Sequence, residues 1–316
     1  MCKKIICILA LISLSIGASA QDIDVNDLIR RYTGENGNKY MQPVADALGA
    51  NLNSGLFHSA MIQPGIKPQI YIGLTTMVAP IPESSKIFTA TTEGSYFPTT
   101  TVDSVPTLFG DPNGYIVGGP GGTKYYFPGG LDINYVPFAA PQLSIGSLFG
   151  TDLTVRYASA NYFVKNLGLE DQDWINKFRF FGWGFRHSIS QWLGDLTNID
   201  IAVGYYSQSI TSRDYLDIRA SLISLQASYQ KSLLTVYGGI GIESSSLQVK
   251  YEDDNLAIDY DLTGVNSVRV TIGATLNAGP VKLNAEYNVS EQSAIAVGLG
   301  IGINELKKEE KSEEKW

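Results

Sequence analysis

The sequence predicts an all-β protein, an antiparallel transmembrane β-barrel of about 12–14 strands with a short N-terminal helical plug. Residues 294–303 alternate between aliphatic side chains and a row that contains only Gly and Ala. Two preceding stretches, residues 267–276 and 281–290, alternate between mostly aliphatic side chains and polar or small ones. Aliphatic side chains that face outward and small or polar ones that face inward are typical of a membrane barrel wall.

The first twenty residues are predicted to be a secretory signal peptide. Lys3 and Lys4 precede a short apolar run, and Ala18-Ser19-Ala20 follows it. This arrangement of a charged start, an apolar centre and a small-residue exit is typical of a cleaved signal. The apolar run is too short to span a bilayer, which disfavours the alternative of a signal anchor. Both cysteines lie in this segment, so we expect the secreted chain to be free of thiols and disulfides.

The secreted part of the chain contains no candidate transmembrane helix, because nothing after Gln21 supplies roughly eighteen consecutive apolar residues. Such a chain can satisfy its backbone in a membrane only as a closed barrel, which predicts the outer membrane of a Gram-negative bacterium. A soluble secreted β-sandwich is the alternative, and the bare Gly and Ala row counts against it. Without Lys3 and Lys4 the formal net charge falls from −8 to −10. That balance argues against nucleic acid as a partner.

Residues 21–60 are expected to form a helical hatch. Residues 24–32 and 40–48 have the apolar spacing of two short helices, and the glycines of the 34–37 stretch separate them. A Gly-punctuated loop with His58 follows. A segment of this kind ahead of a barrel either plugs the lumen or lies in the periplasm, and a flexible leader is the alternative.

Residues 61–304 are expected to form the barrel. The first strand is predicted at residues 69–79, and a long surface excursion with short strands follows it up to residue 130. Residues 131–138 and 142–148 are predicted to be two short strands, and regular alternation resumes at Asp152.

Three further features of the barrel can be predicted from the alternation and the turn residues. The strand from Arg219 to Tyr229 changes phase near Leu222, which predicts a β-bulge. The Asn277–Pro280 stretch predicts a tight turn between the next two strands. The last strand is predicted to end at Ile303, and residues 305–316 to form a charged, disordered tail.

The sequence does not predict catalytic or metal-binding chemistry. With only His58 and His187 available, a His-rich metal site is excluded, and no cofactor is expected. The alternation places His187 on the face opposite to Ser188 and Ser190, so a serine nucleophile and its base would diverge. We therefore do not expect an enzyme. His187 fits better at the membrane interface, near an aromatic cluster on the same strand.

Several charged residues are predicted to face the interior. Cations on this inner wall could attract a carboxylate or phosphate headgroup. Mutual ion pairs that rigidify a packed lumen are the alternative interpretation, and both stay open at this point. The inward-facing charged residues are Arg156, Arg186, Asp200, Arg269, Lys282 and Glu286.

Four segments together resemble an uncharacterised Bacteroidota family of outer-membrane barrels. That family is itself similar to the FadL-type carriers of long-chain fatty acids and other hydrophobic compounds. The resemblance implies a hatch inside the lumen, lateral openings into the bilayer and passive uptake of a small hydrophobic or amphipathic compound. The segments are residues 53–60, 105–110, 150–157 and 185–192.

Under this resemblance the hatch would run from Asp24 to His58, with Phe57 and His58 at its edge. Arg186 and Arg269 would contact the headgroup of the compound, and outer-membrane lipid would surround the wall. A structural or interaction barrel, such as a secretion-system component or an adhesion scaffold, is the alternative. Uptake predicts a continuous apolar pocket that leads to a wall opening. A scaffold predicts a lumen filled by side chains and an external docking loop.

Overall fold

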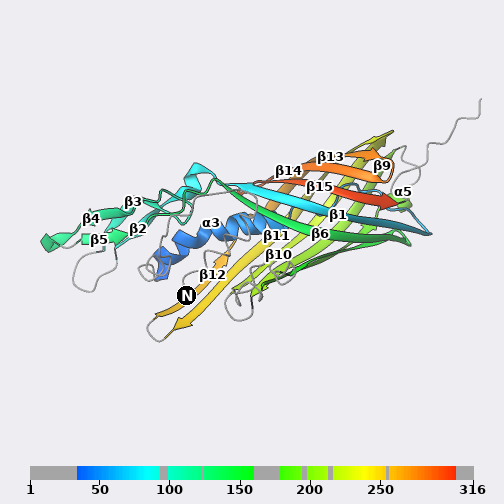
Figure 1. The fold of residues 1–316 in the computed structure, drawn as a ribbon. Coiled ribbons are helices and arrows are strands. Elements are labelled where there is room, and N and C mark those ends of the chain that lie inside the picture. The colour runs from blue at the N-terminus through cyan, green and yellow to red at the C-terminus, as the bar shows by residue number, and fades with distance from the viewer. Residues whose placement is uncertain are drawn as a thin grey trace, which may run out of the picture.

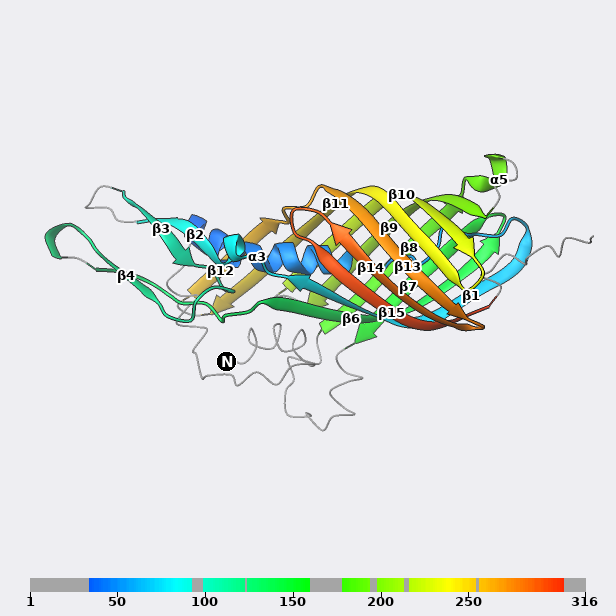
Figure 2. The ribbon, with the colours of Figure 1, turned by 90° about the horizontal axis from the view of Figure 1, so that it is seen from above.

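The protein is an antiparallel β-barrel with a helix at one end of its lumen (Figures 1 and 2). The computed structural model describes residues 34–92, 99–122, 124–159, 178–193, 198–212, 216–253 and 256–303. In these ranges ten strands close the ring, and the pairing of β10 with β11 completes it. The ring consists, in order, of β1 (Ile66–Pro80), β6 (Tyr135–Leu148), β7 (Thr151–Ser159), β8 (Phe178–Ser188), β9 (Ile199–Ser212), β10 (Leu216–Lys231), β11 (Leu234–Asp253), β13 (Val268–Ala278), β14 (Val281–Val289) and β15 (Ala294–Ile303).

The predicted fold class is confirmed, but the ring has fewer strands than the expected 12–14, because five of the strands in the described ranges lie outside it. Two hairpins project beyond one end of the barrel (Figure 1). They pair β2 (Ile87–Thr91) with β3 (Thr101–Pro106), and β4 (Tyr115–Gly118) with β5 (Lys124–Phe127). The fifth, β12 (Leu256–Thr263), pairs only with β11.

Strands β12 and β13 lie end to end along one edge of β11. β13 pairs with residues 234–242 of β11, and β12 pairs with residues 246–253. Between these ladders, residues 264–267 lie opposite residues 243–245, so four residues face three, as in a β-bulge. Beyond this bulge β12 takes the place of β13 along the edge of β11. We call the part formed by residues 207–212, 216–222 and 244–263 the extension, and the rest of the ring the spanning section.

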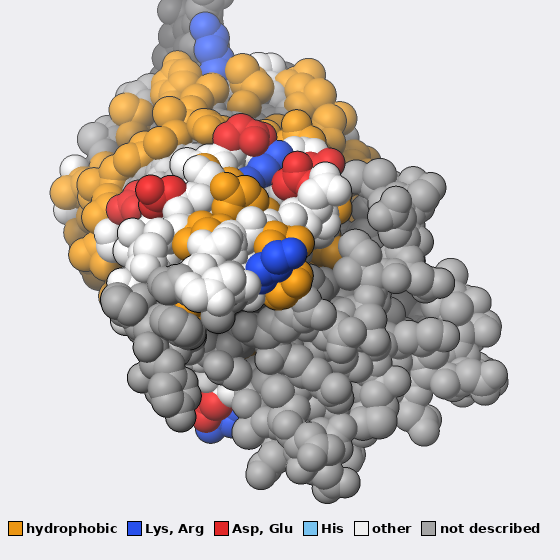
Figure 3. Space-filling view, turned by 90° about the vertical axis from the view of Figure 1, so that its left-hand side faces the viewer, with side chains coloured by type: hydrophobic (Ala, Val, Ile, Leu, Met, Phe, Trp, Pro, Cys, Tyr) orange, Lys and Arg blue, Asp and Glu red, His pale blue; other side chains and the backbone are white. Residues whose placement is uncertain are grey.

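The outward side chains change character where the spanning section ends. On β11, Leu234, Val236, Ile240 and Ile242 are exposed and apolar, whereas Ser244, Gln248 and Lys250 beyond them are polar. Seen from the hairpin end, apolar side chains form an arc around the wall, and a group of charged side chains lies inside that arc (Figure 3). The apolar band covers about nine residues per strand, the length that crosses a bilayer as a tilted strand.

The inward side chains change in the opposite sense, and the bulge predicted near Leu222 is wrong. The pairing of β10 with both neighbours runs without a register shift. Leu216, Ile218, Ala220 and Leu222 point inward in the extension, and polar residues from Ser224 onward continue the same inward row. The interior therefore changes from apolar to polar while the pleat keeps its phase.

The N-terminal part of the described chain is one helix, α3 (Gly34–Leu52). The prediction of a second short helix at residues 40–48 is wrong about its extent, because the helix begins at Gly34 and continues through Gly37. Propensity gives way here to tertiary packing, since most of the helix is buried. Residues 24–32, the signal peptide and the tail lie outside the described residues. None of the helices that the structure describes is long and apolar enough to cross a membrane.

Other predicted boundaries can be compared directly with the structure. The two short strands expected at residues 131–138 and 142–148 are one strand, β6, which continues through Pro141. The tight turn is confirmed, with Gly279 at a φ of 64°, and the last strand ends at Ile303 as predicted. Short helical turns are found at η1 (Glu83–Lys86), η2 (Pro120–Gly122) and α5 (Ser190–Leu193).

Candidate functional site: the closed lumen

One continuous N-terminal segment closes the interior. Helix α3 packs in the extension against β10, β11 and β12, and also contacts β1. Residues 53–62, which we call the hatch segment, continue through the spanning section, and all of them except Ser59 are buried. The chain then enters β1 at Ile66. The lumen is thus filled by the chain's own N-terminal part.

The contact between α3 and the extension is apolar. The helix contributes Met41, Val44 and Leu48 to the largest buried cluster, and the wall contributes Ile218 and Leu247. All five side chains are buried in the interior of the extension. The outward side chains of β10 and β11 in the extension are polar. The extension therefore has the polarity of a water-soluble barrel, with an apolar core and a polar surface.

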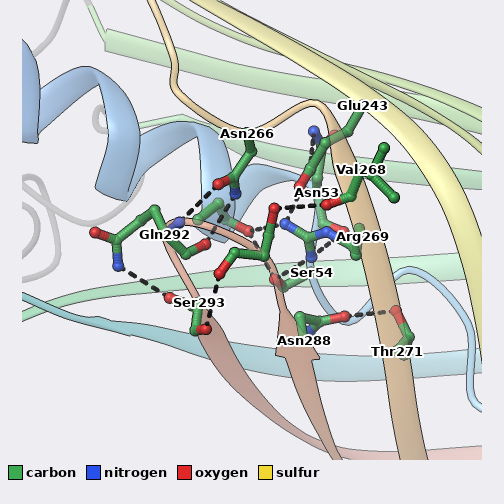
Figure 4. Close-up of polar contacts among 12 residues, drawn as sticks. Asn53, Ser54, Glu243, Asn266, Val268, Arg269, Thr271, Asn288, Gln292 and Ser293 are labelled. Carbon is green, nitrogen blue, oxygen red and sulfur yellow. Dashed lines mark hydrogen bonds and ion pairs between the residues drawn. The ribbon is translucent and has the colours of Figure 1, made fainter.

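Arg269 of β13 joins the wall to the hatch segment (Figure 4). Its Nη2 lies 2.9 Å from Glu243 Oε2, and both side chains are 1% exposed. Its guanidinium donates to the carbonyl oxygens of Ala50 and Asn53 at 3.0 Å each and to Ser54 Oγ at 2.8 Å. The side-chain amide of Asn53 also donates, from Nδ2 to Glu243 Oε2 at 2.9 Å. A buried arginine with a carboxylate on one side and carbonyl groups on the other fixes the end of α3 against the wall.

Two more arginines reach the hatch segment from neighbouring strands. Arg156 of β7 donates from Nε to Gln142 Oε1 at 2.9 Å and from its terminal nitrogens to the carbonyl oxygens of Ser54 and Gly55. Arg186 of β8 forms an ion pair with Asp152 and donates to the Ser59 carbonyl.

Other wall groups satisfy the rest of the hatch backbone. Glu286 Oε1 accepts from the Gly55 amide at 2.6 Å. Thr275 Oγ1 donates to the His58 carbonyl at 2.7 Å, and Ser228 Oγ accepts from the Ala60 amide at 3.0 Å. Groups from several strands therefore replace the hydrogen bonds that this irregular segment would make with water.

Phe57, His58, Arg186 and Arg269, the residues predicted to bind a ligand, all contact the hatch segment or belong to it. The Phe57 ring packs edge-on against Tyr237, with ring centroids 5.4 Å apart. The centroid of the His58 ring lies 4.3 Å from the centroid of the Tyr71 ring. Arg186 contacts the hatch at Ser59 and Arg269 contacts it at its opposite end, so the structure does not bring these two arginines to one shared group.

Sequence reasoning missed the contribution of Asn53 and Glu243. Asn53 belongs to a loop with no periodic pattern, so no sequence signal identified its contacts. Glu243 continues the inward row of Gly239 and Gly241, and this phase could have identified it as an inward carboxylate. Arg156 was correctly placed on the inner face, but its contact with the hatch could not be predicted.

The buried charges of the described chain balance. The charged side chains buried in the interior comprise four basic and four acidic residues. At least two of the basic groups, Arg186 and Arg269, form ion pairs within this set. A lumen with this balance has no excess positive charge to offer an anion while the hatch is in place. The eight residues are Asp152, Arg156, Arg186, Asp200, Glu243, Arg269, Lys282 and Glu286.

The bare inner row of β15 allows close packing. A Cβ atom added to Gly300 would lie 2.6 Å from the Tyr71 ring, and one added to Gly298 would clash with Asn284. Ala296 of the same row lies next to Gly55 of the hatch segment, which adopts a φ of 66°. Neighbouring side chains and the hatch segment therefore cover this row, and larger residues would displace them.

No group of three or more His, Cys, Asp or Glu side chains that could hold a metal ion is found in the described ranges. His187 lies on the outer face of β8, with Nδ1 2.8 Å from Thr151 Oγ1 and its ring 4.9 Å from the Trp192 ring. Ser188 is buried on the inner face.

Comparison with solved structures finds weak similarity to several proteins. Ail, the attachment invasion locus protein of Yersinia pestis, has 11% identity and a TM-score of 0.25 over 76% of this chain and 98% of its own. A TodX variant, a monoaromatic hydrocarbon channel, has 11% identity and a TM-score of 0.29 over 80% and 94%. The toluene transporter TbuX of Ralstonia pickettii has 8% identity and a TM-score of 0.26 over 77% and 90%. All three TM-scores lie below 0.5, a level that does not support transferring any property.

Comparison with functionally curated proteins finds no match. Comparison with protein families does find one, and it extends from the first residue to the end of β15. The chain belongs to the family of unknown function DUF6588, whose sequence profile matches residues 1–303.

Proposed function

We propose that this outer-membrane barrel takes up a small hydrophobic or amphipathic compound passively, and that displacement of the hatch segment opens the path. The observation that supports this proposal is the nature of the closure. Hydrogen bonds and apolar contacts hold a single chain segment in the lumen, and the chain has no cysteine after residue 7 to fix it covalently. Such a segment can move without unfolding the ring.

The proposal includes an orientation. Short turns such as Ala278–Val281 lie at the end where β1 begins and β15 ends, and short turns face the periplasm in outer-membrane barrels. The extension and the two hairpins would then face the outside. A compound that arrives there would meet the apolar interior around α3 before it reaches the polar hatch region. The Bacteroidota origin is also part of the proposal, and it depends on the sequence resemblance alone.

The wall arginines have two roles in this proposal. In the closed state Arg186 and Arg269 hold the hatch carbonyls, as described above. When the hatch moves, these donors become available for the headgroup of an amphipathic compound, while Phe57 and His58 line the edge of the opening. The compound and the hatch segment therefore compete for the same hydrogen-bond donors.

A disulfide between the hatch and the wall tests the proposal. Ser59 and Ser228 face each other with hydroxyl oxygens 3.4 Å apart. We expect Ser59→Cys/Ser228→Cys to abolish cellular uptake of a radiolabelled long-chain fatty acid or toluene when oxidised and to recover it after reduction. The matched control, Ser221→Cys/Ser244→Cys, joins two wall strands at an exposed pair 3.0 Å apart and should leave uptake unchanged. Full uptake with the hatch locked would refute hatch movement.

An interaction barrel without transport is the second candidate, and the filled, charge-balanced lumen favours it. In that case neither disulfide should change the entry of any hydrophobic probe, because none enters through the protein. Equal uptake by cells with and without the protein would therefore support this candidate.

A further inference from the structure

A patch of exposed apolar side chains lies at the short-turn end of the barrel. We call it the rim patch. It combines residues from β1, β6, the β6–β7 turn and the short helix α5, and Phe149 and Trp192 are 70% and 67% exposed. Side chains of this size are rarely left in water together. The rim patch consists of Ile66, Leu148, Phe149, Trp192 and Leu193.

Backbone contacts show that the rim patch is one surface. Ile66 pairs with Leu148 across the β1–β6 ladder, and the Phe149 amide donates to the Gly65 carbonyl at 3.2 Å. The Ser188 amide donates to the Gly150 carbonyl at 2.8 Å, which joins the β6–β7 turn to the end of β8. The helix α5 follows directly, and its Trp192 ring packs on His187. These contacts join the two strand ends, the turn and the helix that carry the five apolar side chains.

The turn that presents Phe149 has an unusual backbone. Ser147 and Phe149 adopt φ values of 72° and 52°, and a bulky residue rarely occupies this left-handed region. The ladders of β6 with both neighbours shift register next to this turn. Strain of this kind persists where the surrounding structure fixes it, often at functional positions. Here it places a large aromatic side chain at the rim with most of its surface exposed.

The rim patch continues the lipid-facing wall. Ile145, Leu153 and Phe185 are exposed on the outer face immediately above it. Trp192 and His187 combine apolar rings with polar nitrogen atoms, the type of side chain that collects at a membrane–water boundary. The β13–β14 turn on another part of the same rim contains only Gly279 and Pro280 between the strands and has no comparable side chains.

We infer that the rim patch inserts into the membrane interface and binds phospholipid at the level of the headgroups and upper acyl chains. The occupant is lipid because the patch is continuous with the apolar wall and ends in amphipathic rings. This one-sided contact would anchor the β1–β6–β7–β8 side of the barrel more deeply than the β13–β14 side. The inference depends on the membrane location of the barrel and is independent of uptake.

Fluorescence quenching by brominated phospholipids tests the inference. The chain has four tryptophans, so Trp174→Phe/Trp183→Phe/Trp316→Phe leaves Trp192 as the only one. In vesicles we expect lipids brominated near the headgroup to remove most of the Trp192 emission, and lipids brominated near the chain end to remove less. The matched variant that keeps only Trp183, an outward residue of the spanning section, reports quenching on the lipid-facing wall.

A second measurement keeps the test decisive if the triple variant does not fold. Phe149→Cys can be labelled with an environment-sensitive dye, because the secreted chain has no other cysteine. A blue-shifted dye emission in vesicles supports the inference. Emission typical of water, together with Trp192 that is quenched by aqueous iodide and untouched by brominated lipid, overturns it. Protection of Trp192 from both quenchers would identify a protein partner in place of lipid, and would also overturn it.

Discussion

The spanning section and the extension share strands but have opposite polarity. On β11, Ile240 faces outward in the spanning section and Gln248 faces outward in the extension, while the inward row changes from Glu243 to Leu247. Apolar side chains outside and paired polar groups inside, as in the spanning section, are typical of a barrel wall that faces lipid. Polar side chains outside and an apolar core, as in the extension, are typical of a structure that faces water. One unbroken strand can therefore serve both environments, because alternation fixes the face of a side chain but not its polarity.

The two sections are also closed by different parts of the N-terminal segment. The apolar core of the extension holds α3, a regular helix whose backbone is satisfied internally. The polar lumen holds the irregular hatch segment, whose carbonyl groups accept from Arg156, Arg186 and Arg269. A helix suits apolar surroundings, whereas a non-helical segment at membrane depth needs partners from the wall.

The largest expected effect concerns the buried ion pair. Arg269→Met leaves Glu243 buried without its cation, and we expect this to lower the free energy of unfolding by about 3–5 kcal/mol. The control is Arg219→Met in the extension, where Arg219 pairs with Asp217 at 2.8 Å but is 73% exposed. That change should cost at most about 1 kcal/mol. Guanidinium unfolding in detergent micelles measures both, and similar small losses would show that the Arg269 network does not hold the lumen.

A lysine introduced on the outer wall should destabilise the spanning section and leave the extension almost unchanged. This loss of stability should be smaller than that caused by Arg269→Met. Ile272 lies outward at the centre of β13 and is 61% exposed. Ile272→Lys should cost about 2–4 kcal/mol in lipid, because the ammonium group enters the hydrocarbon region. Gln248→Lys, outward in the extension beside Asp261, should change stability by no more than about 0.5 kcal/mol. Unfolding in vesicles at graded urea tests this, and an equally tolerant Ile272 position would place it outside the membrane.

The smallest expected effect concerns the contact of α3 with the bulge. Asp46 Oδ1 accepts from Gln42 Nε2 and from the Val265 amide, both at 2.8 Å. Burial raises the pKa of Asp46, the two hydrogen bonds oppose that rise and Glu291 adds to it. Because its pKa is raised, the protonated Asp46 carboxyl stabilises the folded state. This contribution is complete below the unfolded pKa and is lost as the pH rises through the folded pKa.

Asp46→Asn keeps an acceptor oxygen for both donors and removes the charge. We expect a gain of less than about 1 kcal/mol at neutral pH and a flatter dependence of stability on pH in the acidic range. Thermal unfolding between acidic and neutral pH measures this, with Glu35→Gln at the exposed start of α3 as the control. A loss of stability at neutral pH would show that the carboxylate is needed in its charged form.

The alternation of the sequence predicted strands correctly where the whole strand lies in a single section. Strands β13, β14 and β15 lie wholly in the spanning section, and their alternation, tight turn and end at Ile303 match the sequence prediction. The prediction failed at one position of β10, a strand that passes between the two sections. At Leu222 the inward row changes from aliphatic to polar, which a local pattern cannot distinguish from a bulge.

The sequence by itself determined the fold class, the inward and outward faces of most strands and the inner position of Arg156, Arg186 and Arg269. Only the tertiary structure decided which carbonyl groups these arginines hold, how far α3 extends and how many strands close the ring. The physical reason is that the pleat is local, with a period of two residues. The hatch carbonyl groups that the inward arginines hold belong to a segment distant in sequence, and no local pattern records these contacts.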